Sequence, residues 1–168
     1  MPENSSNTPT PLVKWVGGKR QLQDPILAKI REVFEPEEAT YFEPFFGGGA
    51  IFFALQPKRA VASDINNGLV NLYSQVISNP EAVKFEALAL EEEYNLLLPE
   101  LQEQFYLEKR ATFNERATSG YENRLGPEGA GLFLFLNKAG FNGMYRENAK
   151  GEFNIPFGKR SKINLFSY

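Results

Sequence analysis

The sequence predicts an α/β fold built around an open sheet of parallel strands. An apolar run at Tyr41–Pro44 leads into the glycine turn Gly47–Gly49, and a second apolar run follows that turn. A further short apolar run ends in the carboxylate of Asp64. Glycines allow a sharp turn and the close approach of a ligand, and open α/β sheets bind nucleoside-bearing cofactors at the carboxyl ends of their strands. We therefore expect such a site around the glycine turn.

Helical periodicity flanks these strands. Apolar residues recur at steps of three and four along Arg20–Phe34, where Asp24-Pro25 is expected to supply the N-cap and the first helical residue. The same periodicity predicts a helix at Asn66–Ile77. The other elements expected in this half are a short helix and two strands, at Ala50–Leu55, Tyr41–Pro44 and Arg59–Asp64.

After a break at Asn79-Pro80, the chain is predicted to be mainly helical. Glu81–Asn114 is expected to form two helices divided near Pro99, with Glu91–Glu93 on a solvated face. Gly129–Leu136 consists of small and apolar residues and predicts a buried helix.

Composition excludes several classes of chemistry. The chain has 168 residues, about one domain, and contains neither cysteine nor histidine. Disulfides, thiolate nucleophiles and imidazole catalysis are therefore excluded, and no metal site is expected. No apolar run approaches the roughly 20 residues that span a membrane, and residues 1–10 are polar without a secretory signal. We expect a disordered lead-in, no membrane partner and a cytoplasmic protein.

Charge is unevenly distributed along the chain. The net charge of -3 argues weakly against nucleic-acid binding, but eight Glu stand against one Lys between Glu81 and Glu108, and six Lys or Arg against two Glu between Lys138 and Lys162. The basic stretch lies largely in Asn137–Arg160, which has no sustained period and predicts a compact loop or irregular hairpin. Its aromatic, amide and basic side chains suit stacking on bases and contacts to base edges and phosphates. A surface loop with scattered charge is the alternative.

Residue type alone leaves two other patterns open. The glycine turn and Asp64 suit a nucleoside cofactor, and a tight strand–helix connection with an incidental acid is the alternative. The dinucleotide fingerprint of a nicotinamide oxidoreductase fails, because Phe52 stands where its third glycine is needed. The loop around Trp15, with Lys14 and Lys19, either brings an aromatic face and two ammonium groups to a ligand or is a plain surface loop.

Five segments in order carry a more specific resemblance: Lys14-Trp-Val-Gly-Gly-Lys19, Glu43-Pro-Phe-Phe-Gly-Gly-Gly-Ala50, Ser63-Asp-Ile-Asn66, Leu136-Asn-Lys-Ala-Gly-Phe-Asn-Gly143 and Gly151-Glu-Phe-Asn-Ile-Pro-Phe-Gly158. The chain resembles the Dam family, the D12 class of S-adenosylmethionine-dependent DNA adenine-N6 methyltransferases, from about Pro11 to Lys162. The resemblance implies a Rossmann-like methyltransferase sheet, incomplete in this chain, with a mainly helical target-recognition insert. The implied divisions are a lead-in at 1–10, the first part of the cofactor domain at 11–80, the insert at 81–162 and a return toward the cofactor domain at 163–168.

The resemblance also implies residue roles. The cofactor S-adenosylmethionine would be bound by Trp15, Lys19, Glu43, Phe45, Gly47, Asp64 and Ile65. Double-stranded DNA would be the partner, with Phe141 wedged beside a flipped base. The candidate DNA-contacting residues are Lys14, Phe141, Asn142, Arg146, Lys159 and Arg160.

The catalytic motif of the family does not occur in the sequence. The family accepts hydrogen bonds from adenine N6 with an Asp-Pro-Pro-Tyr motif, and this chain has no Pro-Pro dipeptide. Asn154-Ile-Pro-Phe157 belongs to a different family segment. We therefore assign no catalytic residue. We expect the chain to be the front part of an enzyme that is inactive alone and needs a C-terminal complementing fragment. A non-catalytic binding remnant or one half of a split enzyme is the alternative, and a nucleotide-cofactor oxidoreductase is less favoured.

Overall fold

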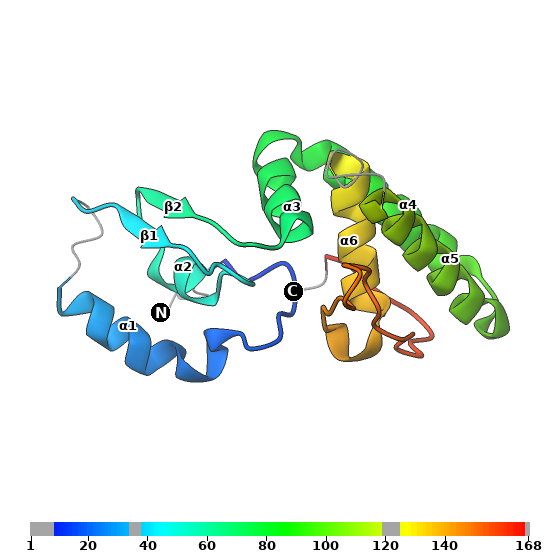
Figure 1. The fold of residues 1–168 in the computed structure, drawn as a ribbon, viewed down its shortest axis with the longest axis horizontal. Helices are drawn as coiled ribbons and strands as arrows, with labels where there is room; N and C mark the ends of the chain where they lie inside the picture. The colour runs from blue at the N-terminus through cyan, green and yellow to red at the C-terminus, as the bar shows by residue number, and fades with distance from the viewer. Residues whose placement is uncertain (1–8, 34–37, 119–124, 167–168) are drawn as a thin grey trace, which may run out of the picture. The chain divides into compact units, whose positions relative to one another are not determined.

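The computed structural model describes residues 9–33, 38–118 and 125–166, and the fold within them is helical with a small parallel sheet (Figure 1). By its contacts the chain divides into two compact units, Met1–Leu12 with Gly17–Asp64 and Val13–Val16 with Ile65–Tyr168. In chain order the elements are η1 (Lys19–Leu22), α1 (Gln23–Arg31), β1 (Tyr41–Glu43), α2 (Ala50–Leu55), β2 (Ala60–Ala62), α3 (Asn67–Ser78), α4 (Pro80–Leu96), α5 (Pro99–Thr118), α6 (Pro127–Ala139) and η3 (Phe141–Gly143).

The first unit is built on β1 and β2, which pair in parallel as the sequence predicts, although both strands are shorter than expected. Successive side chains of a strand point to opposite faces, so one face of the pair holds Tyr41 and the other holds Phe42. Tyr41 packs on the core of the unit. Phe42 is 67% exposed, and Val61, its partner in the register, is 52% exposed. One face of this sheet is therefore apolar and open.

Two helices cover the other face. Leu27 of α1 and Ile51 and Leu55 of α2 form the buried core of this unit. The predicted start of α1 is wrong, because Leu22, without a side-chain cap, holds the N-cap position in place of Asp24. The helix still tolerates Pro25, which lies in its first turn. Residues of the first turn have no intrahelical partner for an N–H, so the N–H that proline lacks is not missed.

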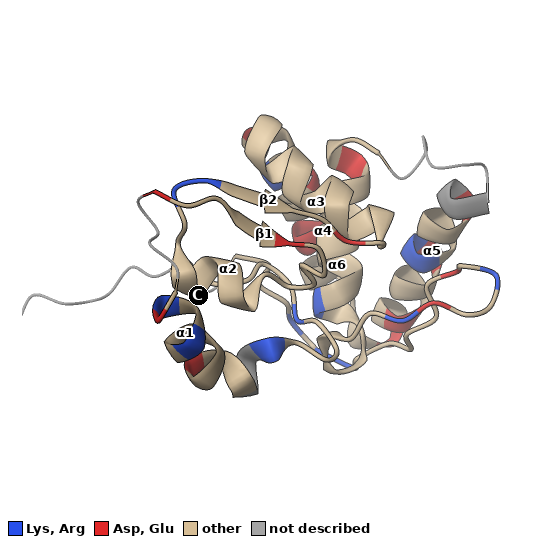
Figure 2. Ribbon diagram, turned by 60° about the vertical axis from the view of Figure 1, so that its left-hand side comes forward, with Lys and Arg blue, Asp and Glu red and all other residues tan. Residues whose placement is uncertain are grey.

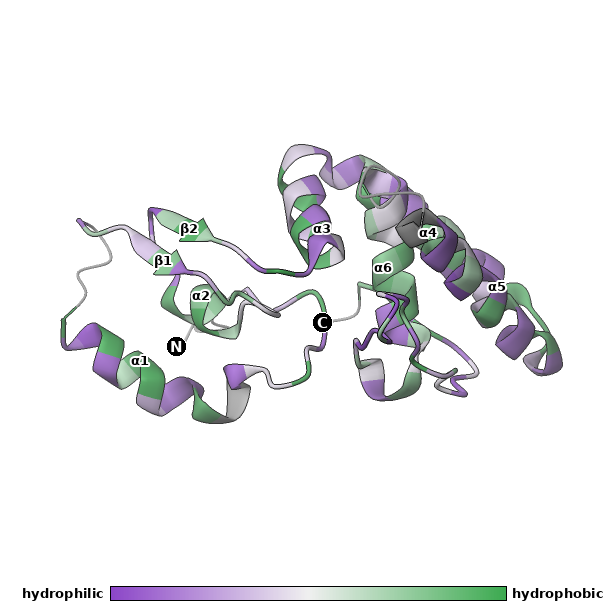
Figure 3. Ribbon diagram, viewed as in Figure 1, coloured by the Kyte–Doolittle hydropathy of each residue, from purple (hydrophilic) through white to green (hydrophobic). Residues whose placement is uncertain are grey.

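The second unit is organised around α6, which packs against α3, α4 and α5. Its residues from Gly129 to Asn137 are all buried, in agreement with the predicted buried helix, and Figure 3 shows it as mostly hydrophobic. Gly131 makes the contact with α4 possible. A Cβ at this position would lie 2.7 Å from the Cβ of Glu86 and 3.0 Å from the backbone nitrogen of Ala87.

The predicted pair of acidic helices is confirmed: α4 ends at Leu96 and α5 begins at Pro99. Acidic positions recur on both (Figure 2). The expected solvated face is wrong in one residue, because Glu91 is half-buried and accepts a hydrogen bond from the Leu165 N–H at 2.5 Å. Glu92 and Glu93 are exposed, as expected.

The chain after α6 forms the predicted irregular hairpin, with two isolated antiparallel bridges, Gly140–Phe157 and Glu147–Phe153. Helix α5 holds it in place. The Tyr106 hydroxyl donates to the carbonyl of Ile155 at 2.9 Å, and the Asn114 amide pairs with both backbone groups of Phe153, at 2.8 and 3.0 Å. The expectations for residues 1–8, 34–37, 119–124 and 167–168 fall outside the described residues, and they include most of the lead-in expected at 1–10 and the end of the return expected at 163–168.

Candidate functional site

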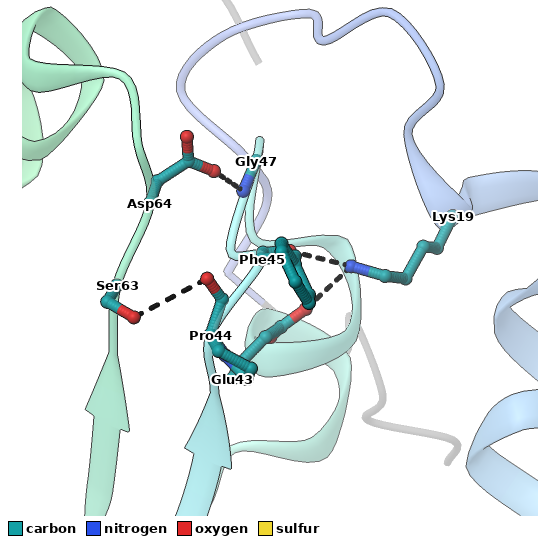
Figure 4. Close-up of polar contacts among 7 residues, drawn as sticks. All are labelled: Lys19, Glu43, Pro44, Phe45, Gly47, Ser63 and Asp64. Carbon is teal, nitrogen blue, oxygen red and sulfur yellow. Dashed lines mark hydrogen bonds and ion pairs between the residues drawn. The ribbon is translucent and has the colours of Figure 1, made fainter.

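The glycine turn lies at the carboxyl ends of β1 and β2, and both strands contribute to it (Figure 4). The carboxylate of Asp64, just after β2, accepts a hydrogen bond from the Gly47 N–H at 2.8 Å. The Phe46 N–H donates to the Ser63 carbonyl at 3.0 Å, which continues the pairing of the strands beyond their ends. The turn is thus fixed by backbone and carboxylate contacts at the edge where open α/β sheets bind their ligands.

Two glycines of the turn are required by its geometry. Gly47 and Gly49 have φ of 54° and 76°, in the left-handed region that glycine adopts without cost. A Cβ at Gly49 would lie 2.6 Å from Cζ of Phe46, so the ring also needs the absence of a side chain there. Gly49 is also the N-cap of α2. The sequence therefore forms the turn and the helix start together.

A charged pair closes the other side of the turn. The ammonium Nζ of Lys19 donates to Oε1 of Glu43 at 3.0 Å and to the carbonyl of Phe45 at 2.9 Å. Glu43 is only 5% exposed, and its other oxygen, Oε2, is buried without a hydrogen-bond partner among the described residues. Burial, together with the nearby charge of Glu43, raises the pKa of Tyr41 to about 12. An unpaired oxygen on a buried carboxylate costs free energy and leaves an acceptor for a ligand cation or donor.

The structure brings five of the seven predicted cofactor residues together in the first unit: Lys19, Glu43, Phe45, Gly47 and Asp64. Trp15 and Ile65 belong to the second unit. Their predicted place in the cofactor site therefore stays a prediction. Phe45 is 79% and Ile65 98% exposed, so neither side chain is used by the core of its unit.

Trp15 is neither a free surface ring nor a core residue. Its ring stacks on Tyr145 with centroids 5.2 Å apart, and Tyr145 stacks on Phe133 of α6 at 5.0 Å. Trp15 is half-buried as a residue, and the stack on Tyr145 fixes the plane of its indole. The loop after Leu12 is thereby attached to the hairpin that follows α6.

The predicted DNA-contacting residues gather on and around that hairpin, in one unit. Phe141 and Asn142 lie in the tight turn η3, both exposed, with Phe141 at 47%. Asn142 has φ of 55°, a left-handed conformation that asparagine tolerates but most residues avoid. Strained non-glycine positions cluster at ligand sites, which fits a turn shaped for contact rather than for stability.

The basic side chains of the hairpin differ in how firmly they are held. Arg146 is exposed, and its Nε donates to Oδ1 of Asn154 at 2.8 Å, which orients the guanidinium. Lys159 and Arg160 are exposed, and Lys159 has φ of 53°, a second left-handed non-glycine position. Figure 2 shows basic positions along these loops.

Sequence analysis counted Lys138 in the basic stretch but did not name it among the candidate DNA-contacting residues. Burial, followed by the charges of Arg160 and Lys14, lowers the pKa of Lys138, and the charge of Glu91 partly offsets this. Lys14 and Arg160 therefore both lie close enough to Lys138 to act on its charge, although Lys14 is far from it in the sequence. The signal in the sequence was a basic residue, Lys138, near the end of a predicted buried helix. An anionic ligand would relieve the repulsion that Lys138 feels from Arg160 and Lys14.

The described residues include no group of three or more acidic, cysteine or histidine side chains able to hold a metal ion. In the same part of the chain, none of the helices combines the length and the apolar character needed to cross a membrane.

Comparison with known proteins identifies the family. The sequence model of the D12 class N6 adenine-specific DNA methyltransferases matches residues 15–167. The chain belongs to this class.

Named relatives agree with this assignment. The Type II methyltransferase M.MjaIII of Methanocaldococcus jannaschii is 35% identical over 161 residues, which cover 93% of this chain and 54% of the relative. The Type II methyltransferase M1.LlaDCHI of Lactococcus lactis subsp. cremoris is 36% identical over 89% of this chain and 48% of its own length. The DNA adenine methylase of Escherichia coli (strain K12) is 33% identical over 89% of this chain and 48% of its own length. The chain thus spans about half the length of the curated relatives it matches.

Proposed function

We propose that this D12-class chain takes part in site-specific methylation of adenine N6 in DNA, with S-adenosylmethionine as the methyl donor. The observation that carries the proposal is the arrangement of Lys19, Glu43, Gly47 and Asp64 around the glycine turn, at the carboxyl ends of two parallel strands. The second unit then contributes the DNA-contacting hairpin. We infer a cytoplasmic location, where a bacterial or archaeal chromosome is accessible to such an enzyme.

The residues of the turn fit the cofactor chemically. S-adenosylmethionine carries an ammonium, a carboxylate, a ribose diol and a sulfonium, and the sulfonium supplies the methyl group when the cofactor is bound. The unpaired Oε2 of Glu43 suits the ammonium, Lys19 suits the carboxylate, and Asp64 suits the ribose hydroxyls. Gly47 lets the backbone approach the ligand closely. The exposed Phe45 offers an apolar surface beside them.

The hairpin fits a duplex from which one adenine is extruded. Enzymes that act on a base take it out of the stack and fill or support the gap. Phe141 is an exposed ring on a tight turn, and Arg146 presents an oriented guanidinium suited to the paired acceptors of guanine. Lys14, Lys159 and Arg160 suit phosphates, and Asn142 suits a base edge. Methylation of an exocyclic amine needs no covalent intermediate, which fits a chain without cysteine.

We further propose that the sheet is part of a larger Rossmann-like sheet, completed by a C-terminal complementing segment. Parallel sheets are normally covered on both faces, whereas Phe42 and Val61 expose an apolar face here. A pair of three-residue strands is also small for an independent sheet. Since the chain lacks the Asp-Pro-Pro-Tyr motif, the segment would supply the catalytic loop, and the chain alone would be inactive.

Methyl transfer from labelled S-adenosylmethionine to adenine-containing duplex DNA tests the proposal. We expect cofactor and DNA binding by the purified chain but no methyl transfer, and transfer once a segment carrying Asp-Pro-Pro-Tyr is added. Binding without any restoration would favour the second candidate, a non-catalytic binding remnant, which the missing motif also fits. Binding of neither ligand would overturn the proposal, and a titration with a nicotinamide cofactor would then test the oxidoreductase alternative.

A further inference from the structure

Asn137 is a buried polar side chain near the end of α6, and all of its hydrogen-bonding groups are used. It is only 4% exposed. Its Oδ1 accepts from the Lys14 N–H at 3.2 Å, and its Nδ2 donates to the carbonyls of Lys14 at 3.0 Å and Gly143 at 2.9 Å. One amide thus ties two segments that are distant in sequence to the same helix end.

The side chain of Lys14 is fitted to the turn as closely as its backbone. A Cβ on Gly143 would lie 2.9 Å from Cδ and 3.3 Å from Cβ of Lys14, so the lysine stem runs directly over this glycine. Gly143 also has φ of 65°, which favours glycine on backbone grounds. Lys14 therefore packs directly against the turn Phe141–Gly143.

Electrostatics alone would not keep Lys14 in this position. The charges of Lys14 and Arg160 both act on Lys138, and like charges repel. The Asn137 hydrogen bonds fix the backbone of Lys14 beside the turn, and the basic charge gathered there favours an anionic ligand.

Resting on the proposed function, we propose that Asn137 is a positioning residue for DNA binding, which fastens Lys14 to the Phe141–Gly143 turn so that both meet the phosphodiester backbone as one preorganised element. Ordering these groups before binding removes an entropic cost from the association. The fastening group is a neutral amide, so it adds no negative charge next to the phosphates. Asn137 itself need not touch DNA.

The test is DNA affinity in single and double variants of the full chain. Fluorescence anisotropy with a labelled adenine-containing duplex at several salt concentrations would compare Asn137→Ala, Lys14→Ala and the double variant. We expect each single variant to bind about tenfold more weakly, the size of one lost contact to a charged group. The slope of log affinity against log salt should fall by about 1 in each. The double variant should bind no more weakly than Lys14→Ala, because Asn137 acts through Lys14.

Asn71 provides the matched control. It is also 4% exposed, and it pairs with the N–H and carbonyl of Gly126, both at 3.0 Å, at the start of α6. Asn71→Ala should lower the free energy of unfolding about as much as Asn137→Ala, with unchanged DNA affinity.

A second pair of variants covers the case in which Asn137→Ala does not fold. Gly143→Ala pushes Lys14 off the turn, whereas a Cβ on Gly151, at φ of 76° in the same hairpin, meets no atom within 4 Å. Both changes carry similar backbone strain, so only Gly143→Ala should weaken DNA binding. The inference would be overturned if Asn137→Ala and Asn71→Ala bound DNA equally well, or if Gly143→Ala and Gly151→Ala did. It would also be overturned if the double variant lost the sum of the two single-variant losses in binding free energy. If the wild-type chain binds no duplex DNA, the proposed function fails first and the inference falls with it.

Discussion

The two regions assigned to ligands are held together by different chemistry. The glycine turn of the first unit is fixed by charged groups: Asp64 holds the Gly47 N–H, and Lys19 joins Glu43 to the Phe45 carbonyl. The hairpin of the second unit is fixed mainly by neutral amides. These are Asn95 on Ile163, Asn114 on Phe153, Asn137 on Lys14 and Gly143, and Asn154 on Arg146.

The difference follows from the ligands that each region is proposed to bind. A cofactor with separate positive and negative groups can be matched by carboxylates and an ammonium already placed in the turn. A polyanion would be repelled by carboxylates, so amides can brace the hairpin without weakening its affinity for phosphates. Variants of the turn should therefore change cofactor affinity, and variants of the hairpin should change DNA affinity and its salt dependence.

The largest effect is expected at Glu43. Glu43→Ala removes a buried carboxylate and leaves the Lys19 ammonium with the Phe45 carbonyl alone. Isothermal titration should show an affinity for S-adenosylmethionine about 100-fold lower, since hydrogen bonds to charged groups contribute about 1.5–3 kcal/mol each. The exposed pair of Lys29 and Glu32, 2.9 Å apart, is the control. Glu32→Ala should leave cofactor affinity unchanged and the free energy of unfolding within about 0.5 kcal/mol.

A smaller effect is expected at Asp64, where two substitutions separate two roles. Asp64→Ala loses both the acceptor for the Gly47 N–H and the proposed ribose contact, and cofactor affinity should fall about tenfold. Asp64→Asn keeps an oxygen for the Gly47 N–H, so its loss should be smaller and the thermal midpoint should stay near that of the wild type. An equal loss in both variants would mean that the charge matters and the tie to the turn does not.

The third effect concerns the exposed ring of Phe141. Phe141→Ala should weaken binding to adenine-containing duplex by about fivefold, because stacking on a base contributes about 1–3 kcal/mol. The loss should be independent of salt, unlike that of Lys14→Ala. The fluorescence of 2-aminopurine at the target position would report the loss of base flipping. Phe85→Ala, at a 71% exposed position on α4, should have neither effect.

The smallest effect is expected at Asn154, which orients the guanidinium of Arg146. Asn154→Ala should reduce discrimination between target and non-target duplexes by about threefold, since holding one long side chain in place saves about 0.5–1.5 kcal/mol. Competition binding measures this ratio. Asn148 braces the same hairpin through Glu152 and the Lys150 N–H but holds no arginine, so Asn148→Ala should keep full discrimination.

Much of the fold was predictable because its signals are local. Periodicity and helix-breaking residues predict three of its features: the helix at Ala50–Leu55, the division near Pro99 and the buried helix around Gly129–Leu136. The start of α1 was not predictable from these local signals. The preceding η1 ends at Leu22 and places the N-cap there, although Asp24 is the better capping residue. Glu91 was misjudged for a similar reason: its partner, the Leu165 N–H, is far away in the sequence.

In the candidate site, too, the contacts between residues distant in sequence were the ones that sequence patterns did not predict. The grouping of Gly47 with Asp64 was predictable, because parallel strands bring their carboxyl ends to one edge. The charged pair of Lys19 and Glu43 joins the first residue of η1 to the last residue of β1, and no local sequence pattern predicts that pairing. The role of Asn137 is likewise invisible in sequence, where it is one amide among many in a basic stretch.

The stacking of Trp15 on Tyr145 has a practical consequence. The chain contains a single tryptophan, so its tryptophan emission, excited selectively at wavelengths that tyrosine does not absorb, arises from one known point. With the indole stacked 5.2 Å from Tyr145, that emission is sensitive to any movement of the hairpin. Intrinsic fluorescence thus provides an unlabelled optical probe of the second unit, through which ligand titrations can be followed in real time.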